Sequence, residues 1–161
     1  MDATEVIKKL GLEKLPEEGG FYKEVFRSPQ ALPDGSGRVL STDIYYLITP
    51  EEFSGLHRVK SSTEIFNFYA GDAAEMIQIT EEGKLTTITL GTNLADGETP
   101  KVIVAPGLWQ GTRLKPGGKW ALLGCTCIPG FEFRDFEGGT FQTLSERFPQ
   151  LTTAIRRFTH T

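Results

Sequence analysis

The residues best suited to chemistry lie between positions 55 and 71, where His57 ends one predicted strand and Glu64 begins the next. The short loop between them lets the imidazole and the carboxylate meet. Side chains alternate along a strand, so Glu64 shares a face with Phe66 and Phe68. If that face points inward, loss of solvent raises the pKa of Glu64, and a histidine beside a buried carboxylate is the usual general base. The structural alternatives are a solvent-facing Glu64 and a core histidine bonded to backbone.

Two adjacent tyrosines supply candidate acids for the same reaction. Tyr45 and Tyr46 lie in the β-rich run 44–48, and the two-residue period of a strand sends their side chains to opposite faces. Whichever of the two faces inward can donate a proton while His57 accepts one. Proton abstraction beside a carbonyl, and related isomerisations or dehydrations, suit such a set of groups.

The other histidine and the two cysteines argue against a metal centre. His160 is the penultimate residue, where chains usually fray. Cys125 and Cys127 share one face of a predicted strand, and a bridge over so short a loop would be strained, so we interpret them as reduced core thiols. The common iron and zinc sites need several imidazoles. We therefore expect no metal and no other cofactor, with a weak carboxylate-and-amide site for a hard cation as the alternative.

The elements that must position these groups are short strands separated by turns. The chain holds 18 glycines and nine prolines in 161 residues, a rhythm typical of an all-β sandwich or barrel. A capping box at Asp2 and Glu5 predicts a short N-terminal helix, and apolar residues at helical spacing follow Thr140. We expect one domain over residues 1–161, an antiparallel double-sheet jelly roll with C-terminal helical turns. The strand candidates are residues 21–26, 38–49, 53–59, 64–69, 74–80, 85–90, 101–105, 110–114, 119–128 and 131–136.

Two segments resemble the motifs of a known superfamily. Residues 55–71 are similar to the first cupin motif, with His57 and Glu64 in place, and residues 106–110 are similar to the second. The resemblance implies a double-stranded β-helix around a pocket, and it extends from Leu15 to about Pro149. Further matches to the largely uncharacterised cupin_5 (RmlC-like) family lie at residues 16–24, 42–48, 109–113 and 129–137.

This resemblance also bears on the metal and on the reaction. Metal-binding cupins supply three histidines and a glutamate from the two motifs, but here Val59 and Gln110 stand at the positions of the second and third histidine. A metal-free pocket lined by Gln110 is therefore implied. Deoxysugar-nucleotide epimerases of the superfamily use a histidine base and a tyrosine acid. Their likeness implies that His57, assisted by Glu64, acts with one of the paired tyrosines.

Several other residues could either contact a ligand or serve only to stabilise the fold. Arg58 and Arg113 can hold a phosphate or carboxylate by paired hydrogen bonds, or make structural ion pairs. Trp109 offers a flat surface to a ring, although aromatic residues of a small β domain are usually core. The set of ligand-binding candidates is Glu24, Arg58, Phe66, Phe68, Trp109, Gln110 and Arg113.

The composition limits the partners. Seventeen basic residues against 21 acidic ones give a formal charge of −4, which argues against a nucleic-acid polymer as partner. No apolar run approaches the ~20 residues of a membrane span. The acidic start lacks the pattern of a secretion signal, so we expect a cytoplasmic protein. Short strands leave edges that need covering, and we expect a homodimer in which the strand 21–26 crosses to the partner.

Three classes of function fit these features. The first is a metal-independent enzyme, an isomerase, epimerase or lyase, that acts on a small polar molecule such as a sugar nucleotide with His57 as base. The second is a non-catalytic protein that binds a nucleotide or sugar in its barrel. The third is an interaction protein that uses the barrel as a scaffold. Loss of the metal histidines favours the second class, and the pairing of His57 with Glu64 favours the first.

Overall fold

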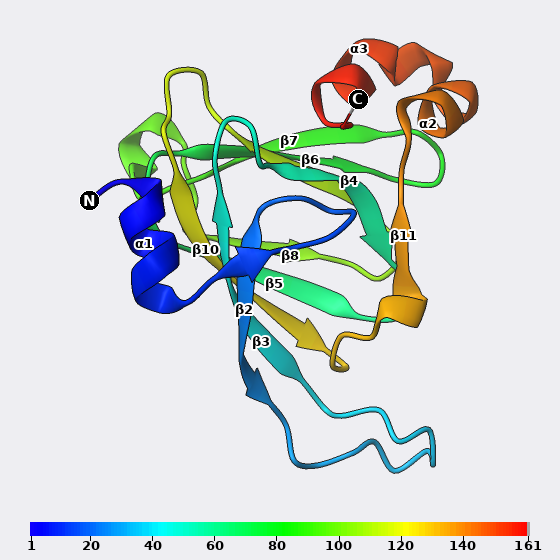
Figure 1. Cartoon of the computed structure of the whole chain (residues 1–161). Helices are drawn as coiled ribbons and strands as arrows, with labels where there is room; N and C mark the ends of the chain where they lie inside the picture. Colours follow the sequence, from blue (N-terminus) through cyan, green and yellow to red (C-terminus); the bar gives the residue numbers. More distant parts are fainter. Residues whose placement is uncertain (161) are drawn as a thin grey trace.

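Two antiparallel sheets packed face to face form the body of the molecule (Figure 1). The computed structural model describes residues 1–160. One sheet has the strand order β1 (Glu13–Lys14), β2 (Phe21–Arg27), β3 (Thr42–Ile48), β10 (Ala121–Ile128), β5 (Thr63–Gly71) and β8 (Lys101–Val104). The other has the order β11 (Phe136–Gly138), β4 (Ser54–Val59), β9 (Trp109–Leu114), β6 (Ala74–Ile79) and β7 (Leu85–Leu90). The predicted jelly roll is confirmed.

Short helices lie at both ends of the chain, as the sequence predicts. The first, α1 (Ala3–Leu10), begins at the Asp2–Glu5 capping box and ends at Gly11, whose φ of 64° is readily adopted only by glycine. At the other end α2 (Phe141–Arg147) and α3 (Thr152–Arg157) lie together beside the five-stranded sheet (Figure 1). Three single 3₁₀ turns complete the structure: η1 (Leu94–Asp96), η2 (Phe133–Asp135) and η3 (Pro149–Leu151).

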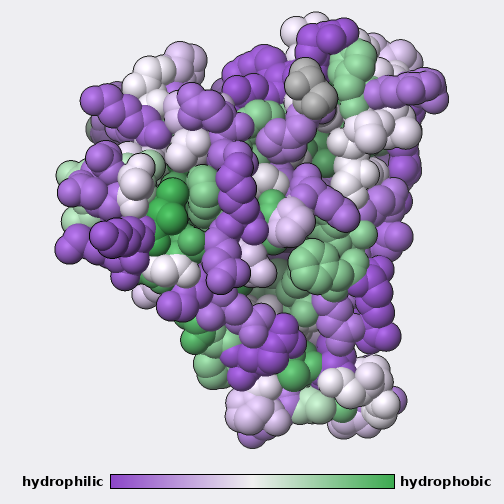
Figure 2. Space-filling model, viewed as in Figure 1, coloured by the Kyte–Doolittle hydropathy of each residue, from purple (hydrophilic) through white to green (hydrophobic). Residues whose placement is uncertain are grey.

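The alternation of side chains along the strands divides the apolar residues into separate clusters. On β3, Tyr46 and Ile48 are buried between the two sheets, whereas Tyr45 and Leu47 point away and pack beneath α1. On the far side of the five-stranded sheet, α2 and α3 cover a third cluster. Hydrophilic side chains cover most of the face seen in Figure 2, and apolar ones are visible in patches.

One predicted strand is wrong, and the predicted strands 38–49 and 119–128 begin before the observed β3 and β10. Residues 131–136 contain the 3₁₀ turn η2, because the amide of Asp135 donates to the carbonyl of Glu132 and the Asp135 carboxylate pairs with Arg38. Only residues 136–138 pair as β11, with β4. Residues 38–41 of the predicted first long strand precede β3 and lie outside it.

Two further observations bear on predicted partners. No helix among residues 1–160 is long and apolar enough to cross a membrane. On β2, Val25 and Phe26 are half exposed, in the strand that we expected to cross to a second copy. The homodimer itself stays a prediction.

Candidate functional site

A cavity of about 540 Å³ opens between the two sheets. Its apolar wall is largely aromatic and includes Phe66, Phe131, Phe133 and Phe136. Its charged lining is unbalanced, since four glutamates face a single arginine, Arg27. The volume lies in the range of ordinary small-molecule sites. The acidic residues in the lining are Glu18, Glu24, Glu64 and Glu132.

One wall of the cavity comes from neighbouring strands of the six-stranded sheet. Glu64 and Phe66 on β5 lie opposite Cys127 and Cys125 on β10, respectively, and all four side chains line the cavity. Tyr46 on β3 adds a phenol to the same wall. The expectation that Glu64 shares an inward face with an aromatic ring therefore agrees with the geometry. Phe68 packs against the same core without lining the cavity.

His57 stands on β4 of the opposite sheet and is almost completely buried. Its Nδ1 lies 2.8 Å from the carbonyl oxygen of Gly55, so the neutral ring carries its proton there and accepts at Nε2. The Gln110 amide nitrogen is the donor, 3.0 Å from Nε2. The ring of Phe136 stacks on the imidazole at 5.2 Å. His57 is not among the residues that line the cavity, which corrects the expectation of a base exposed to ligand.

Gln110 connects His57 to Glu64. Its Nε2 lies 3.4 Å from Glu64 Oε1, so the amide donates one hydrogen to each group. The two predicted catalytic side chains thus meet through an amide and not directly. Gln110 is fully buried, and its own Oε1 has no hydrogen-bond partner among the described residues. Like His57 it does not line the cavity, which corrects the expectation of a pocket lined by Gln110.

Glu18 is the carboxylate nearest His57, and sequence reasoning missed it. Its Oε1 lies 3.8 Å from His57 Nε2 and accepts a hydrogen bond of 2.8 Å from Ser54 Oγ. Glu18 lines the cavity while His57 lies behind it. A usable signal was present in the matched segment 16–24, where two glycines follow two glutamates. Such a pair marks a sharp turn that can aim a side chain inward.

The turn that carries Glu18 is firmly held. Glu17, Gly19 and Gly20 have φ values of 65°, 93° and 78°, and a left-handed glutamate is unusual enough to indicate a constrained turn. The carbonyl of Glu18 accepts the amide hydrogen of Gly55 at 2.8 Å. These contacts fix the direction in which the Glu18 carboxylate points.

His160 holds the same turn, which corrects the expectation of a frayed end. Its ring stacks on Phe53 at 4.2 Å, and its Nε2 lies 3.0 Å from the carbonyl oxygen of Glu18. The preceding Phe158 and Thr159 are buried. Residues 158–160 are thus packed between β4 and the Glu18 turn.

Burial and neighbouring charges shift the ionisation of these groups. Burial raises the pKa of Glu64 to about 7, and the charge of Glu18 adds to this rise while His57 opposes it. Burial lowers the pKa of His57, but the charges of Glu18 and Glu64 outweigh burial and the pKa lies above its usual value. Burial also raises the pKa of Tyr46. The cluster therefore keeps protons to a higher pH than the same groups in water.

Of the two candidate tyrosines, only Tyr46 faces the cavity. Its hydroxyl donates to the carbonyl of Gly19 at 2.7 Å. Tyr45 lies on the opposite face of β3, edge-on to the ring of Tyr69 at 6.3 Å. The strand period excludes Tyr45 from the cavity.

Three other candidates lie outside the barrel for the same reason. Because His57 points inward on β4, its neighbour Arg58 points outward, where it pairs with Glu81 and Glu137. Because Gln110 points inward on β9, Trp109 and Arg113 point outward. Trp109 packs beneath the C-terminal helices, and the Arg113 guanidinium lies 4.2 Å from the centre of the Phe53 ring.

Glu24 lies in the cavity lining, where it was proposed as a ligand contact. Both of its carboxylate oxygens accept hydrogen bonds of 2.8 Å from Arg27. These side chains are partly exposed, at 39% and 46% respectively, which places them toward the solvent end of the cavity.

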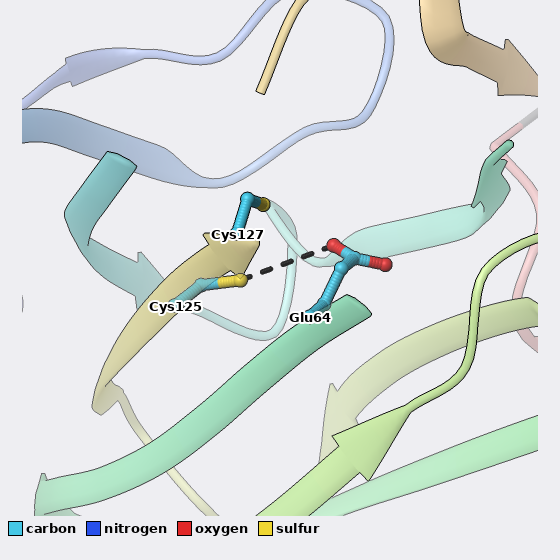
Figure 3. A group of neighbouring side chains, drawn as sticks. All are labelled: Glu64, Cys125 and Cys127. Atoms are coloured by element: carbon cyan, nitrogen blue, oxygen red, sulfur yellow. Dashed lines mark hydrogen bonds between the residues drawn. The ribbon is translucent and has the colours of Figure 1, made fainter. Parts of the chain in front are cut away.

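The imidazole-rich metal centre of metal-binding cupins does not fit this cavity. Both ring nitrogens of His57 are engaged, by Gly55 and Gln110. Val59, at the position of the second histidine, presents a hydrocarbon side chain to the cavity. A different set of donors is close together: Glu64, Cys125 and Cys127 each offer one atom, all within 4.8 Å of one another (Figure 3).

Comparison with known proteins defines the class. The jelly roll and the cavity between its sheets are those of a cupin, and the chain belongs to the family described as Cupin_5, Cupin superfamily (DUF985), which it matches over residues 4–138. Protein SO0799 from Shewanella oneidensis is 36% identical, with a TM-score of 0.92 over 99% of this chain and 98% of its own. A hypothetical protein from Leishmania major is 31% identical over the whole of both chains, also with a TM-score of 0.92.

More distant structures share only the fold. A dTDP sugar isomerase from Desulfovibrio desulfuricans G20 is 17% identical, with a TM-score of 0.57 over 86% of this chain and 85% of its own. Oxalate decarboxylase from Bacillus subtilis is also 17% identical, with a TM-score of 0.57, over 91% of this chain and 37% of its own. No curated protein matches the chain.

Proposed function

We propose that this cupin is an enzyme that moves a proton on a small polar molecule held in the barrel, as an isomerase or epimerase does. The observation that carries the proposal is the Glu18–His57 pair, whose nearest atoms are 3.8 Å apart with both side chains largely buried. A carboxylate that faces the ligand can accept a proton from it. An imidazole behind this carboxylate can balance its negative charge before the proton is taken up. Glu18 takes the ligand-facing role first assigned to His57.

The proton step follows from which group reaches the cavity. The Glu18 carboxylate takes a proton from a carbon beside a ligand carbonyl, and the C–H bonding electrons move into the carbonyl to form an enolate. Where that carbon carries a hydroxyl group, the hydroxyl proton passes to the carbonyl oxygen, and the proton held on Glu18 is delivered to the former carbonyl carbon to give the isomer. The proton can exchange with solvent while Glu18 holds it, so no reactant other than water is needed. Tyr46 can donate to the enolate oxygen only after its hydroxyl leaves the Gly19 carbonyl. Its role is therefore secondary to that of Glu18.

The cavity favours a neutral or cationic ligand. Four glutamates and one arginine in its lining disfavour an anion inside the barrel. The phenyl rings of the wall suit the face of a sugar-like ring. If the ligand is a sugar nucleotide, its diphosphate must lie toward the solvent end, beside Arg27. Likeness to the dTDP sugar isomerase supports this class by fold alone.

Binding without turnover is the second candidate function. The recessed position of His57 favours it, because an imidazole whose nitrogens are both hydrogen-bonded is withheld from ligand. A non-catalytic protein would hold its ligand by the same lining residues with no proton exchanged.

Exchange with solvent separates the two functions. The full-length protein is incubated in D₂O with a panel of ketosugars, with and without attached nucleotide, and deuterium uptake at carbon is followed by mass spectrometry. An enzyme incorporates deuterium even where no net product accumulates. Glu18→Gln and His57→Gln should slow the exchange by about 100-fold or more. Glu17→Gln, in the same turn but exposed and outside the cavity lining, is the matched control. Binding of a panel member with no deuterium uptake would support the second function.

A further inference from the structure

Two thiols and a carboxyl group come together on one wall of the cavity. Cys125 and Cys127 alternate on β10 and so share its inward face, and Cys127 is the cross-strand partner of Glu64 on β5. The Cys125 sulfur lies 3.9 Å from Glu64 Oε2. Figure 3 shows the three side chains converging from the two strands. Both cysteines are buried and free of disulfides.

The spacing of these atoms is close to that of ligands around one metal ion. Bond lengths of about 2.3 Å to sulfur and 2.0 Å to oxygen put neighbouring tetrahedral ligand atoms about 3.5–3.8 Å apart. The Cys125–Glu64 separation of 3.9 Å is near this value, and all three atoms lie within 4.8 Å. The most distant pair of atoms must therefore approach by about 1 Å at most to share one ion.

The surroundings of Glu64 leave room for a further positive charge, because the nearest cationic side chain, His57, meets it only through Gln110. No lysine or arginine pairs with this buried carboxyl group among residues 1–160. Glutamates outnumber basic residues around the cavity. Buried charges are normally paired or coordinate metals. Gln110 holds Oε1, the oxygen other than the one nearest Cys125, as outer-shell groups commonly hold a ligating carboxylate.

We propose that Glu64, Cys125 and Cys127 form a binding site for one thiophilic divalent cation of the zinc class. Two thiolates select such an ion over magnesium or calcium, which prefer oxygen ligands. Three protein ligands leave a fourth position, and since all three residues line the cavity, that position faces ligand. On binding, two metal–sulfur bonds and one metal–oxygen bond form, and the thiol protons leave to solvent. The site revises our expectation of a bare pocket and does not depend on the Glu18–His57 proton step.

Cobalt titration tests the site directly. The full-length protein is reduced, stripped with a chelator and titrated with Co²⁺ without oxygen, while the near-ultraviolet thiolate-to-cobalt absorption is recorded. We expect one Co²⁺ per chain and displacement by Zn²⁺. Cys125→Ser, Cys127→Ser and Glu64→Gln should each weaken binding by at least about tenfold, the loss that even outer-shell changes can cause. Thr126→Ser is the matched control, because Thr126 lies between the cysteines on the outer face and bonds Asp43.

Two results would overturn the proposal. One is the absence of thiolate absorption in the wild-type protein, and the other is unchanged Co²⁺ affinity in the cysteine variants. If these variants fail to fold, alkylation of the wild-type thiols supplies the second measurement. Zn²⁺ should slow alkylation of both cysteines, and no slowing would contradict the site. The deuterium exchange assay tests the roles of Glu18 and His57, whereas the metal titration tests Glu64, Cys125 and Cys127. Either proposal can therefore fail while the other stands.

Discussion

The interior of the barrel and the cluster beneath the C-terminal helices are built on opposite faces of the same strands. On β4, Leu56 points to the helices and His57 points into the barrel; on β9, Trp109 and Gln110 divide in the same way. The outer cluster is built mainly from apolar side chains, and the Trp109 Nε1 within it has no hydrogen-bond partner among the described residues. The inner face instead carries buried polar groups beside a cavity of about 540 Å³. The interior of the barrel therefore contains open space and polar groups, whereas the outer cluster is filled mainly by hydrocarbon side chains.

This division separates stability from chemistry. An apolar cluster stabilises the fold in proportion to the area that it removes from water. Buried glutamates and a histidine offset that gain, because each loses hydration that its partners replace only in part. Because the two faces alternate along each strand, a one-residue slip in register would exchange them. The outer cluster thus helps to hold His57 and Gln110 in their inward positions.

Truncating a matched pair of phenylalanines gives the largest expected effect. Phe158 in the outer cluster and Phe66 on the cavity wall are both almost completely buried. Phe158→Ala should lower the free energy of unfolding by about 3–5 kcal/mol, because it opens a void in a closely packed apolar cluster. Phe66→Ala should lose less, about 2 kcal/mol, since its ring already borders open space. Urea unfolding of both variants measures the difference.

The outcome of this pair decides whether the cavity exists in solution. Equal losses for Phe66→Ala and Phe158→Ala would mean that the barrel interior is packed as densely as the outer cluster. Comparable losses would therefore count against a ligand cavity. Circular dichroism of each variant checks that the strands persist.

The fold was predictable because it rests on patterns that repeat along the chain. Turn residues between short apolar runs indicated the strands, and the Asp2–Glu5 capping box marked the start of α1. The period of two also implied that Arg58 opposes His57, and that Trp109 opposes Gln110. Applying this period strictly would have removed both Arg58 and Trp109 from the candidate ligand contacts.

The site was less predictable because it depends on contacts between distant segments. The glycines after Glu18 indicate a turn, but nothing local gives its direction toward His57, since the turn is held by Gly55 and by His160, 142 residues away. The grouping of Cys127 with Glu64 likewise follows from the pairing of β10 with β5. The spacing of the two cysteines placed them on the same face of one strand, but it did not predict which residue lies opposite them on the adjacent strand.

Replacing Glu18 should shift the titration of His57 to lower pH, and we expect this effect to be smaller than the loss of stability in the phenylalanine variants. The nearby carboxylate helps to raise the pKa of His57, so Glu18→Gln should lower it. Proton NMR of the imidazole ring follows the titration directly. With only two histidines in the chain, His160→Gln assigns the signals. An unchanged His57 titration in Glu18→Gln would break the proposed pair.

The raised pKa of His57 also makes the free energy of unfolding depend on pH. A pKa raised in the folded state means that the folded protein binds the proton more tightly than the unfolded chain. The contribution of the Glu18–His57 pair is therefore complete below about pH 6.5 and is lost as the pH rises through the raised pKa of His57. Glu64 also titrates in this region, so the relevant quantity is the difference between wild type and Glu18→Gln. That difference should shrink with increasing pH.

The smallest expected effect belongs to Arg58, on the outer face of β4. Arg58→Met should change the free energy of unfolding by no more than about 1 kcal/mol, because the glutamate partners Glu81 and Glu137 are 49% and 35% exposed and ion pairs open to solvent contribute little. Its partner Glu137 keeps Lys60, and its partner Glu81 keeps Arg147. The methionine side chain can still cover Trp109, over which the guanidinium lies at 4.8 Å. The rate of deuterium uptake by the ligand and the affinity for Co²⁺ should both equal those of the wild-type protein. Arg58 lies on the other side of the sheet from the cavity. A loss of either would mean that the outer face communicates with the barrel interior, and the separation of the two faces would fail.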